Sequence, residues 1–423
     1  MACESGDSSR RRLTLASLPP GAEWLLVGVA LAVLLRGLAQ ALLLFMRSPL
    51  NPDVAGFIED ARVMRAFYDC PAREPFHVLW LKAGLLFSSD AELVARLTTL
   101  VQTVLLGVLL YVFGARFFGR LTGLAALALF SINPVIRFYG VSGLRDPLFA
   151  AALLLFGILL FSPPAEKGRT RQALLAGAAG ALLILTRVYA YAIVAGAFGV
   201  YLLHQRAWRP ERRRPAARFL MWAALATAVL VVPDILFRPP SPIHGQTVNL
   251  FRNLELKGEA GSWQTDPPGS HLDYLFKDHT LPQVIARVTA NYTRYAWQYL
   301  PFYLRGYEIC WVLLPVGILA AFACRRGFVA GLLALALAPV VFVLNLNQAP
   351  GALGIESRFV LQAFPLALVL AVHGLLFSAE RLLRLAASHL PAFNSLYARL
   401  GPVLLPLGTQ TATGGLTPRP QPD

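Results

Sequence analysis

The residues best suited to chemistry in this sequence stand just outside long apolar runs. Asp53 follows the end of the first such run by about seven residues. A carboxylate in that place could have a catalytic role. It could also cap a helix, because Asp accepts backbone N–H bonds well at a helix N-terminus. Glu59 and Asp60 follow, and we expect them on a solvated face of the same short helix.

A second group of charges surrounds later apolar runs. Arg145, Asp146 and Pro147 open one of them, where Asp146 suits the N-cap and Pro147 the first turn. Arg187 stands in a turn between two others, next to Tyr189. An Arg so close to membrane-length apolar runs is costly unless it is paired or binds an anion. Arg187 is therefore expected either to pair with a carboxylate such as Asp146 or to bind an anion.

The last apolar run begins with Glu356 and Arg358. The planar guanidinium of Arg358, at the start of a helix, could hold a lipid phosphate. It could also simply extend to the membrane surface. Glu74 begins a second short helix after Asp53, and Glu74 and Arg145 complete our set of candidate binding residues.

The composition excludes a soluble enzyme and a disordered chain. Of 423 residues, 56% are hydrophobic and only 14% charged, against about 25% charged in ordinary soluble domains. The net charge of +15 fits cytoplasmic loops held against anionic lipid, and we expect no nucleic-acid partner. The four cysteines show neither metal-ligand spacing nor a disulfide framework.

The apolar runs predict an all-α polytopic membrane protein with about ten transmembrane helices. We expect these at 24–46, 95–115, 121–138, 146–162, 172–186, 188–203, 218–236, 305–324, 328–346 and 358–378. Residues 1–23 would form a cytoplasmic tail, 24–378 the membrane domain, and 379–423 a partly disordered cytoplasmic tail. Asn133 and Pro134 should break the third helix.

Orientation follows from the basic residues in short loops. An N-terminus in the cytoplasm puts every short basic cluster on the cytoplasmic side. Residues 75–87 are too short to span and should lie on the outer face. The long outer loops are then 47–94 and 237–304, and most of the candidate chemistry faces outward. Aromatic residues in 237–304 could form an interfacial belt or line an acceptor site, and the His and Asp spacing there is too loose to name a metal.

The order of these pieces resembles the GT-C superfamily of membrane glycosyltransferases, in the branch with protein O-mannosyltransferases and the lipid A aminoarabinose transferase. The matching segments are NPDVAGFIEDARVM, LRDPLFAAALLLF, LLILTRVYAYAIV and ESRFVLQAFPLALVLA. The third is similar to the family's "LTR" helix. The fourth is similar to its "RY-x-x-P" pattern, with Phe359 in place of Tyr. The resemblance covers roughly residues 20–380.

The resemblance implies a polyprenyl-phosphate-linked sugar donor and a lipid, glycan or protein acceptor at the outer face. Asp53 would be the general base of an inverting transfer, and Arg358 would bind the leaving phosphate. Arg187 would assist, and Asp146 would orient the acceptor or an arginine. Many members carry a paired acidic motif where Val54 follows Asp53, so we expect no cofactor and do not favour a divalent metal.

Two other classes stay open from the sequence. A transporter or lipid flippase would use charges inside the membrane, for which Arg36 and Asp234 are the candidates. A polysaccharide polymerase or an assembly protein would use the outer arginines. The composition, rich in Ala, Arg, Gly and Pro, is typical of a GC-rich bacterium. We therefore expect an inner-membrane protein with both termini in the cytoplasm.

Overall fold

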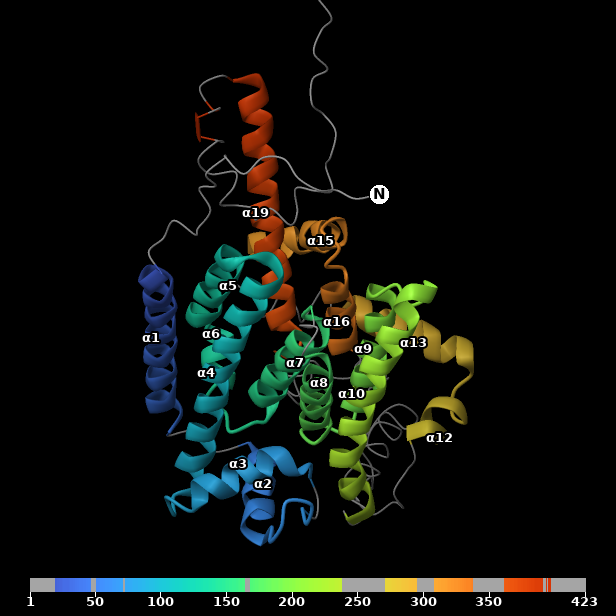
Figure 1. Cartoon of the computed structure of the whole chain (residues 1–423). Helices are drawn as coiled ribbons and strands as arrows, with labels where there is room; N and C mark the ends of the chain where they lie inside the picture. Colours follow the sequence, from blue (N-terminus) through green and yellow to red (C-terminus); the bar gives the residue numbers. More distant parts are fainter. Residues whose placement is uncertain are drawn as a thin grey trace, which may run out of the picture.

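The computed structural model describes residues 20–46, 51–70, 73–163, 168–237, 271–294, 308–337 and 361–390, with residues 393, 395 and 396. The described residues form helices and connecting turns, with no strand among them (Figure 1). The all-α prediction is therefore confirmed. The helices are α1 (Pro20–Phe45), α2 (Pro52–Val63), α3 (Pro75–Leu85), α4 (Ala91–Phe118), α5 (Arg120–Ile132), α6 (Pro134–Tyr139), α7 (Asp146–Phe161), α8 (Arg169–Ile184), α9 (Ala190–His204), α10 (Pro210–Phe237), α12 (His271–Phe276), α13 (Leu281–Arg294), α15 (Glu308–Ala323), α16 (Phe328–Ala336) and α19 (Phe364–His389).

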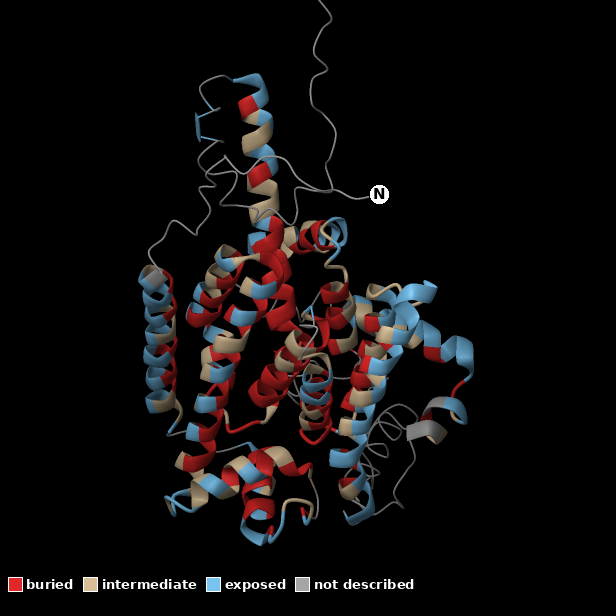
Figure 2. Ribbon diagram, viewed as in Figure 1, coloured by how far each residue is buried: buried red, intermediate tan, exposed pale blue. Residues whose placement is uncertain are grey.

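Four described helices are long and apolar enough to cross a membrane: α1, α4, α10 and α19. Shorter apolar helices, α5, α7, α9 and α15, stand among them. The buried residues concentrate in the middle of the bundle, on α7, α8 and α19, whereas α1 and α10 turn exposed faces outward (Figure 2). This is the arrangement of a membrane bundle, in which apolar side chains cover the outside as well as the core.

Glycines set the closest helix contacts. A Cβ at Gly177 of α8 would lie 2.1 Å from the Ala223 carbonyl oxygen of α10. A Cβ at Gly317 of α15 would lie 1.8 Å from the Leu370 carbonyl oxygen of α19. Both positions exclude any larger residue, because small residues let membrane helices pack backbone against backbone.

Several helix boundaries differ from those expected. The segment predicted at 121–138 is two helices, and the break expected at Asn133 is present: its side chain accepts the N–H groups of Val135 (2.9 Å) and Ile136 (3.1 Å) and so caps α6. α10 begins at Pro210 and α19 continues to His389, both beyond the apolar runs. Hydropathy locates the apolar part of a helix and misses polar turns that prolong it.

The two short helices expected after α1 are present as α2 and α3, and they lie together at the end of the bundle where α1 ends and α4 begins (Figure 1). The Lys82 ammonium of α3 donates to the Met64 carbonyl just after α2. The Tyr68 hydroxyl donates to the Leu230 carbonyl of α10 (2.8 Å). The first bond joins the two short helices to each other, and the second ties the segment after α2 to the bundle.

Candidate functional site

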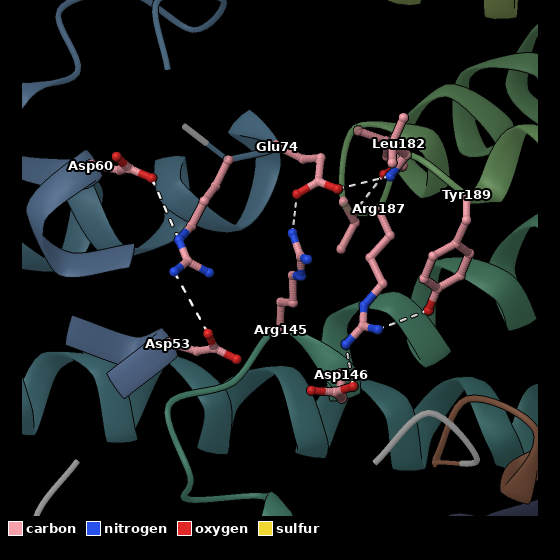
Figure 3. Close-up of polar contacts among 11 residues, drawn as sticks. Asp53, Asp60, Glu74, Arg145, Asp146, Leu182, Arg187 and Tyr189 are labelled. Carbon is pink, nitrogen blue, oxygen red and sulfur yellow. Dashed lines mark hydrogen bonds and ion pairs between the residues drawn. The ribbon is translucent and has the colours of Figure 1, made fainter. Parts of the chain in front are cut away.

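A cluster of charged side chains lies where α2 and α3 meet the end of the bundle (Figure 3). Its members come from α2, the start of α3, the start of α7 and the turn between α8 and α9. We call it the charged cluster, and it consists of Asp53, Asp60, Arg73, Glu74, Arg145, Asp146, Arg187 and Tyr189. Glu74 and Val188, which are 114 positions apart along the chain, are hydrogen-bonded here.

Arg73 lies between two carboxylates of α2. Its Nη2 is 3.7 Å from Asp53 Oδ1, and its Nε is 3.8 Å from Asp60 Oδ2. The guanidinium carbon is 4.4 Å from the centre of the Phe57 ring, a cation–π contact. A Cβ at Gly56 would lie 2.6 Å from Arg73 Nη2, so the glycine leaves the space that the guanidinium occupies.

The two carboxylates differ in access to solvent. The Asp53 side chain is 35% exposed and the Asp60 side chain only 8%. The expectation that Asp60 lies on a solvated face is therefore wrong, because that side of α2 turns toward Arg73; Glu59 is exposed as expected. Burial raises the pKa of the Asp60 carboxyl, with Arg73 acting in the opposite direction.

The cap of α2 is Asn51. Its side-chain oxygen accepts the Asp53 N–H (2.9 Å), and Pro52 occupies the first turn. The capping role considered for Asp53 therefore belongs to Asn51. This leaves the Asp53 carboxylate in the first turn of α2, in contact with Arg73 and with solvent.

Glu74 joins α3 to two other parts of the site. One carboxylate oxygen accepts the Val188 N–H (2.8 Å), and the other pairs with the Arg145 guanidinium. The Phe76 N–H donates to the Leu185 carbonyl (3.1 Å) at the same junction. Because Glu74 is buried, these bonds are shielded from water, and they set the position of the turn that carries Arg187.

Arg187 pairs with Asp146, as one of the two sequence-based alternatives predicted. Its Nη1 also donates to the Tyr189 hydroxyl (2.8 Å), which donates to Gln362 Oε1 (2.7 Å) just before α19. The predicted N-cap role of Asp146 is wrong by one position: α7 begins at Asp146 itself, after Arg145. Its carboxylate holds Arg187 instead.

His77 of α3 lies buried behind the charged cluster. Its Nδ1 is 3.2 Å from Gln102 Nε2 of α4, and its ring meets the Phe57 ring edge to face, 4.9 Å between centres. Burial, together with the charges of Arg145, Arg187 and Arg73, lowers the pKa of His77 to about 3, although a backbone hydrogen bond to Gly143 acts in the opposite direction. The imidazole is neutral at physiological pH.

The structure thus brings together five candidates singled out from the sequence: Asp53, Glu74, Arg145, Asp146 and Arg187. Two others, Glu356 and Arg358, lie outside the described residues, as does much of the loop 237–304. Within the described ranges, no group of three or more His, Cys, Asp or Glu side chains could hold a metal ion, and we assign no residue to one.

Sequence reasoning missed two members of the site, Arg73 and His77. Arg73 stands directly before the Glu-Pro pair that opens α3. The sequence did offer one signal for Arg73. It is a charged residue next to a predicted helix start, in a loop that already held several candidates. Nothing in the sequence near His77 shows that the three arginines meet around it.

Comparisons with known proteins agree with this architecture. Residues 73–237 match a family described as dolichyl-phosphate-mannose-protein mannosyltransferase. The matched stretch contains every member of the charged cluster except Asp53 and Asp60. No curated protein matches the chain.

Three solved structures share the fold. ArnT from Cupriavidus metallidurans bound to undecaprenyl phosphate matches at a TM-score of 0.53 and 20% identity, covering 86% of this chain and 64% of that one. An oligosaccharyltransferase from Archaeoglobus fulgidus in complex with Zn and sulfate matches at 0.52 and 14%, covering 88% and 52%. AglB from Archaeoglobus fulgidus, in complex with an inhibitory peptide and a dolichol-phosphate, matches at 0.50 and 12%, covering 92% and 55%.

The chain spans less than two thirds of the length of each of these structures. Identities this low show the fold alone. The resemblance to the GT-C superfamily is confirmed at this level: the chain has the fold of a GT-C membrane glycosyltransferase.

Proposed function

We propose that the chain is a membrane glycosyltransferase that moves a sugar from a polyprenyl-phosphate-linked donor to an acceptor hydroxyl at the charged cluster. The observation that carries the proposal is the contrast among its four carboxylates. Asp60, Glu74 and Asp146 are buried, and the latter two are paired closely with arginines. Asp53 is the most accessible of the four, with 35% of its side chain exposed.

Asp53 would act as the general base. Its carboxylate takes the proton of the acceptor hydroxyl while the hydroxyl oxygen attacks the anomeric carbon of the donor. The bond from that carbon to the phosphate oxygen breaks on the opposite side, so the sugar inverts and the lipid phosphate leaves with the bonding electrons. Arg73, which touches Asp53, would hold the carboxylate in place.

Asp146 then takes the other role that the resemblance implied for it, orienting an arginine. Both Asp146 and Arg187 are 3% exposed, so an acceptor hydroxyl does not reach the Asp146 carboxylate. The pair directs Arg187 toward Tyr189, and Tyr189 contacts Gln362.

The leaving phosphate would bind Arg358. Gln362 follows Arg358 by four positions and is hydrogen-bonded to Tyr189, which supports an approach of this part of the chain to the charged cluster. Two of the three solved structures that share the fold were determined with undecaprenyl phosphate or a dolichol-phosphate, which supports a polyprenyl-phosphate donor here.

A transporter or flippase is less well supported. Of the two intramembrane candidates, Asp234 is buried one turn before the end of α10, and Arg36 is exposed on the outside of α1. Neither lies in the interior of the bundle at mid-depth, where a conducting path would need charges. The buried ion pairs of the charged cluster gather at one end of the bundle instead.

The orientation completes the proposal. The charged cluster would face the outside of the inner membrane, with both termini in the cytoplasm, because that arrangement puts the short basic loops inside. The acceptor, a lipid, glycan or protein, would then arrive from the outer side, while the donor is held in the membrane.

The test uses the purified full chain in lipid nanodiscs with a panel of undecaprenyl-phosphate sugars and mixed acceptors. Release of undecaprenyl phosphate is measured with and without acceptor. Asp53→Asn keeps the shape of the side chain and leaves the Asn51 cap intact, so turnover should fall by about 10²–10⁴-fold with folding preserved.

The matched control is Glu59→Gln, an exposed carboxylate of the same helix, which should keep near-normal turnover. Near-normal turnover in Asp53→Asn would show that the base is misassigned. Failure of the native chain to release undecaprenyl phosphate from any donor of the panel would contradict the proposed reaction class.

A further inference from the structure

Arg36 is a charged residue on the outer face of a membrane helix. α1 packs on the bundle through buried residues that include Leu34, Leu38 and Ala41, whereas Arg36 points away from them and is exposed. Within the part of the chain that the structure describes, Arg36 forms no ion pair or hydrogen bond. Two buried charges in the candidate spans are paired, in contrast: Glu23 with Arg120 (2.9 Å) and Glu380 with Arg384 (2.7 Å).

The depth of Arg36 makes its exposure unusual. It lies nine residues before Phe45, the last residue of α1, a distance of about 14 Å along the helix axis. The hydrocarbon core is about 30 Å thick, so this position is near its middle. Side chains on a helix lean toward its N-terminus, which takes the guanidinium away from the nearer membrane surface. Arg36 therefore needs a hydrogen-bond acceptor at its own depth.

The helix surface around Arg36 is shaped for close approach. Gly28, Ala32 and Ala39 are exposed on the same side of α1, and Gly28, Ala32 and Arg36 are spaced four residues apart. A Cβ built at Gly28 would meet no atom within 4 Å. Rows of small residues at this spacing let a second membrane helix come near enough for interhelical hydrogen bonds.

We propose that this surface of α1, made of Gly28, Ala32, Arg36 and Ala39, docks a transmembrane helix of another membrane protein that carries an Asp or Glu near its middle. Charge complementarity selects the occupant, because the guanidinium offers only donors and a carboxylate accepts two of them side by side. The inference does not depend on the proposed glycosyltransferase activity.

The described candidate spans of a second copy would not supply the carboxylate. In the four candidate spans, Glu23, Asp234 and Glu380 are buried, and Glu92 and Glu211 stand in the first turns of their helices. None of the carboxylates described for these spans is therefore exposed at mid-depth. A lipid phosphate is the other source of negative charge, and it belongs at the membrane surface, on the far side of the apolar turns that follow Arg36.

Photo-crosslinking in native membranes tests the proposal with the full chain. A benzophenone amino acid replaces Ala32, and the captured protein is identified by mass spectrometry. Leu26 is the control position, since it is 48% exposed on α1 but about 120° around the helix from Ala32. We expect a specific adduct at position 32, absent at 26, with a protein that has a mid-span Asp or Glu.

The charge is tested next. Arg36→Leu should reduce the adduct by roughly 3-fold to 30-fold, the range that one interhelical polar contact is worth. Arg36→Glu should abolish it, and replacing the partner's carboxylate by Arg should restore it. Arg36→Leu makes α1 more apolar, so insertion is preserved, which thermal unfolding of the purified variant checks.

Three results would overturn the proposal. The adduct could be unchanged in Arg36→Leu, or the captured protein could lack a mid-span carboxylate. Adducts at position 32 only with phospholipid would show that Arg36 binds a lipid phosphate instead.

Discussion

Arg187 and Asp146 form an ion pair between the turn after α8 and the first residue of α7, and each side chain is only 3% exposed. A buried pair of this kind is weak evidence for stability, because removing two charges from water offsets most of their attraction. Its clearer effect is on geometry. The pair fixes the Arg187 guanidinium, which then donates to the Tyr189 hydroxyl (2.8 Å).

Breaking one side of this pair should destabilise the protein strongly. Asp146→Asn leaves the Arg187 charge buried without its counter-ion, and such changes lower the free energy of unfolding by about 3–5 kcal/mol. Thermal unfolding in detergent measures the loss. The double variant Asp146→Leu with Arg187→Met removes both charges and should recover much of it. Asp273→Asn, in the exposed Asp273–Lys277 pair, is the control and should change little. An equal loss in Asp146→Asn and the double variant would contradict this account.

His77 should make stability depend on pH. The unfolded chain binds a proton on this histidine below a pH of about 6.5, whereas burial lowers its pKa in the folded protein to about 3. The unfolded state therefore binds more protons between these values. The free energy of unfolding should fall by up to about 1.4 kcal/mol per pH unit as the pH drops below 6.5.

The variant His77→Gln isolates this effect, since other titrating groups stay the same. Its stability should be lower than that of the native chain at pH 8, because Gln102 loses its partner, and the difference should shrink toward pH 5. A difference that stays constant between pH 8 and pH 5 would show that His77 does not titrate in this way.

The sequence predicted the helices better than it predicted the site. Apolar runs locate α1, α4 and α7 because burial in lipid requires about 20 apolar residues, a signal that is local in the sequence. The five candidates that meet in the charged cluster were recognised because charges beside apolar runs are rare. Their contacts were harder to predict from the sequence, since the Glu74–Arg145 and Glu74–Val188 contacts join segments 71 and 114 positions apart.

Asp60 shows why the local pattern was misleading. The expectation of a solvated face treats α2 as if it lay alone on a surface. Asp60 stands three positions after Phe57, so it borders the buried side of α2. Arg73, from the following segment, covers that face with its guanidinium. Only the tertiary structure shows that an arginine 13 positions along the chain covers this carboxylate.

Glu74 should hold the turn between α8 and α9 through one hydrogen bond. Glu74→Gln keeps an oxygen that can accept the Val188 N–H but removes the charge opposite Arg145, whereas Glu74→Ala removes both. The rate of hydrogen exchange at the Val188 amide, followed by mass spectrometry, should be nearly native in the Glu74→Gln variant. Exchange should be roughly 5-fold to 150-fold faster in the Glu74→Ala variant, because an unsatisfied buried donor costs about 1–3 kcal/mol of local stability. Equal exchange in both variants would show that the Arg145 pair, and not the amide bond, positions the turn.

The proposed orientation predicts where reporters work. A fluorescent reporter that folds only in the cytoplasm should be active when fused after Arg120, Arg171, Arg213 or Arg326, because these residues belong to the short basic loops. Alkaline phosphatase, which needs an oxidising compartment, should be active when inserted within 240–300. Phosphatase activity at the four basic sites would reverse the orientation and put the charged cluster in the cytoplasm.

Substitution of Arg73 should distinguish two roles of this residue, neutralising the buried Asp60 and positioning Asp53. Arg73→Gln removes the cation shared by Asp53 and Asp60, which lie 3.7 and 3.8 Å from it. Burial already raises the pKa of Asp60, and without Arg73 it should rise further, so stability should fall as the buried carboxylate loses its counter-charge. Donor turnover should fall by roughly 10-fold to 150-fold if the charge-assisted contact to Asp53, worth about 1.5–3 kcal/mol, acts in the transition state.

The double variant Arg73→Gln with Asp60→Asn distinguishes the two roles. It removes the unpaired buried charge, so the unfolding temperature should return toward the native value, while turnover should stay low because Asp53 is still without its guanidinium. Arg62→Gln, an exposed arginine of α2, is the matched control and should alter neither quantity. The expected loss lies in kcat more than in KM, since the proposed general base Asp53 would act on the acceptor proton during the transfer. If the double variant recovers turnover together with stability, Arg73 only neutralises Asp60, and the orientation of Asp53 must come from another contact.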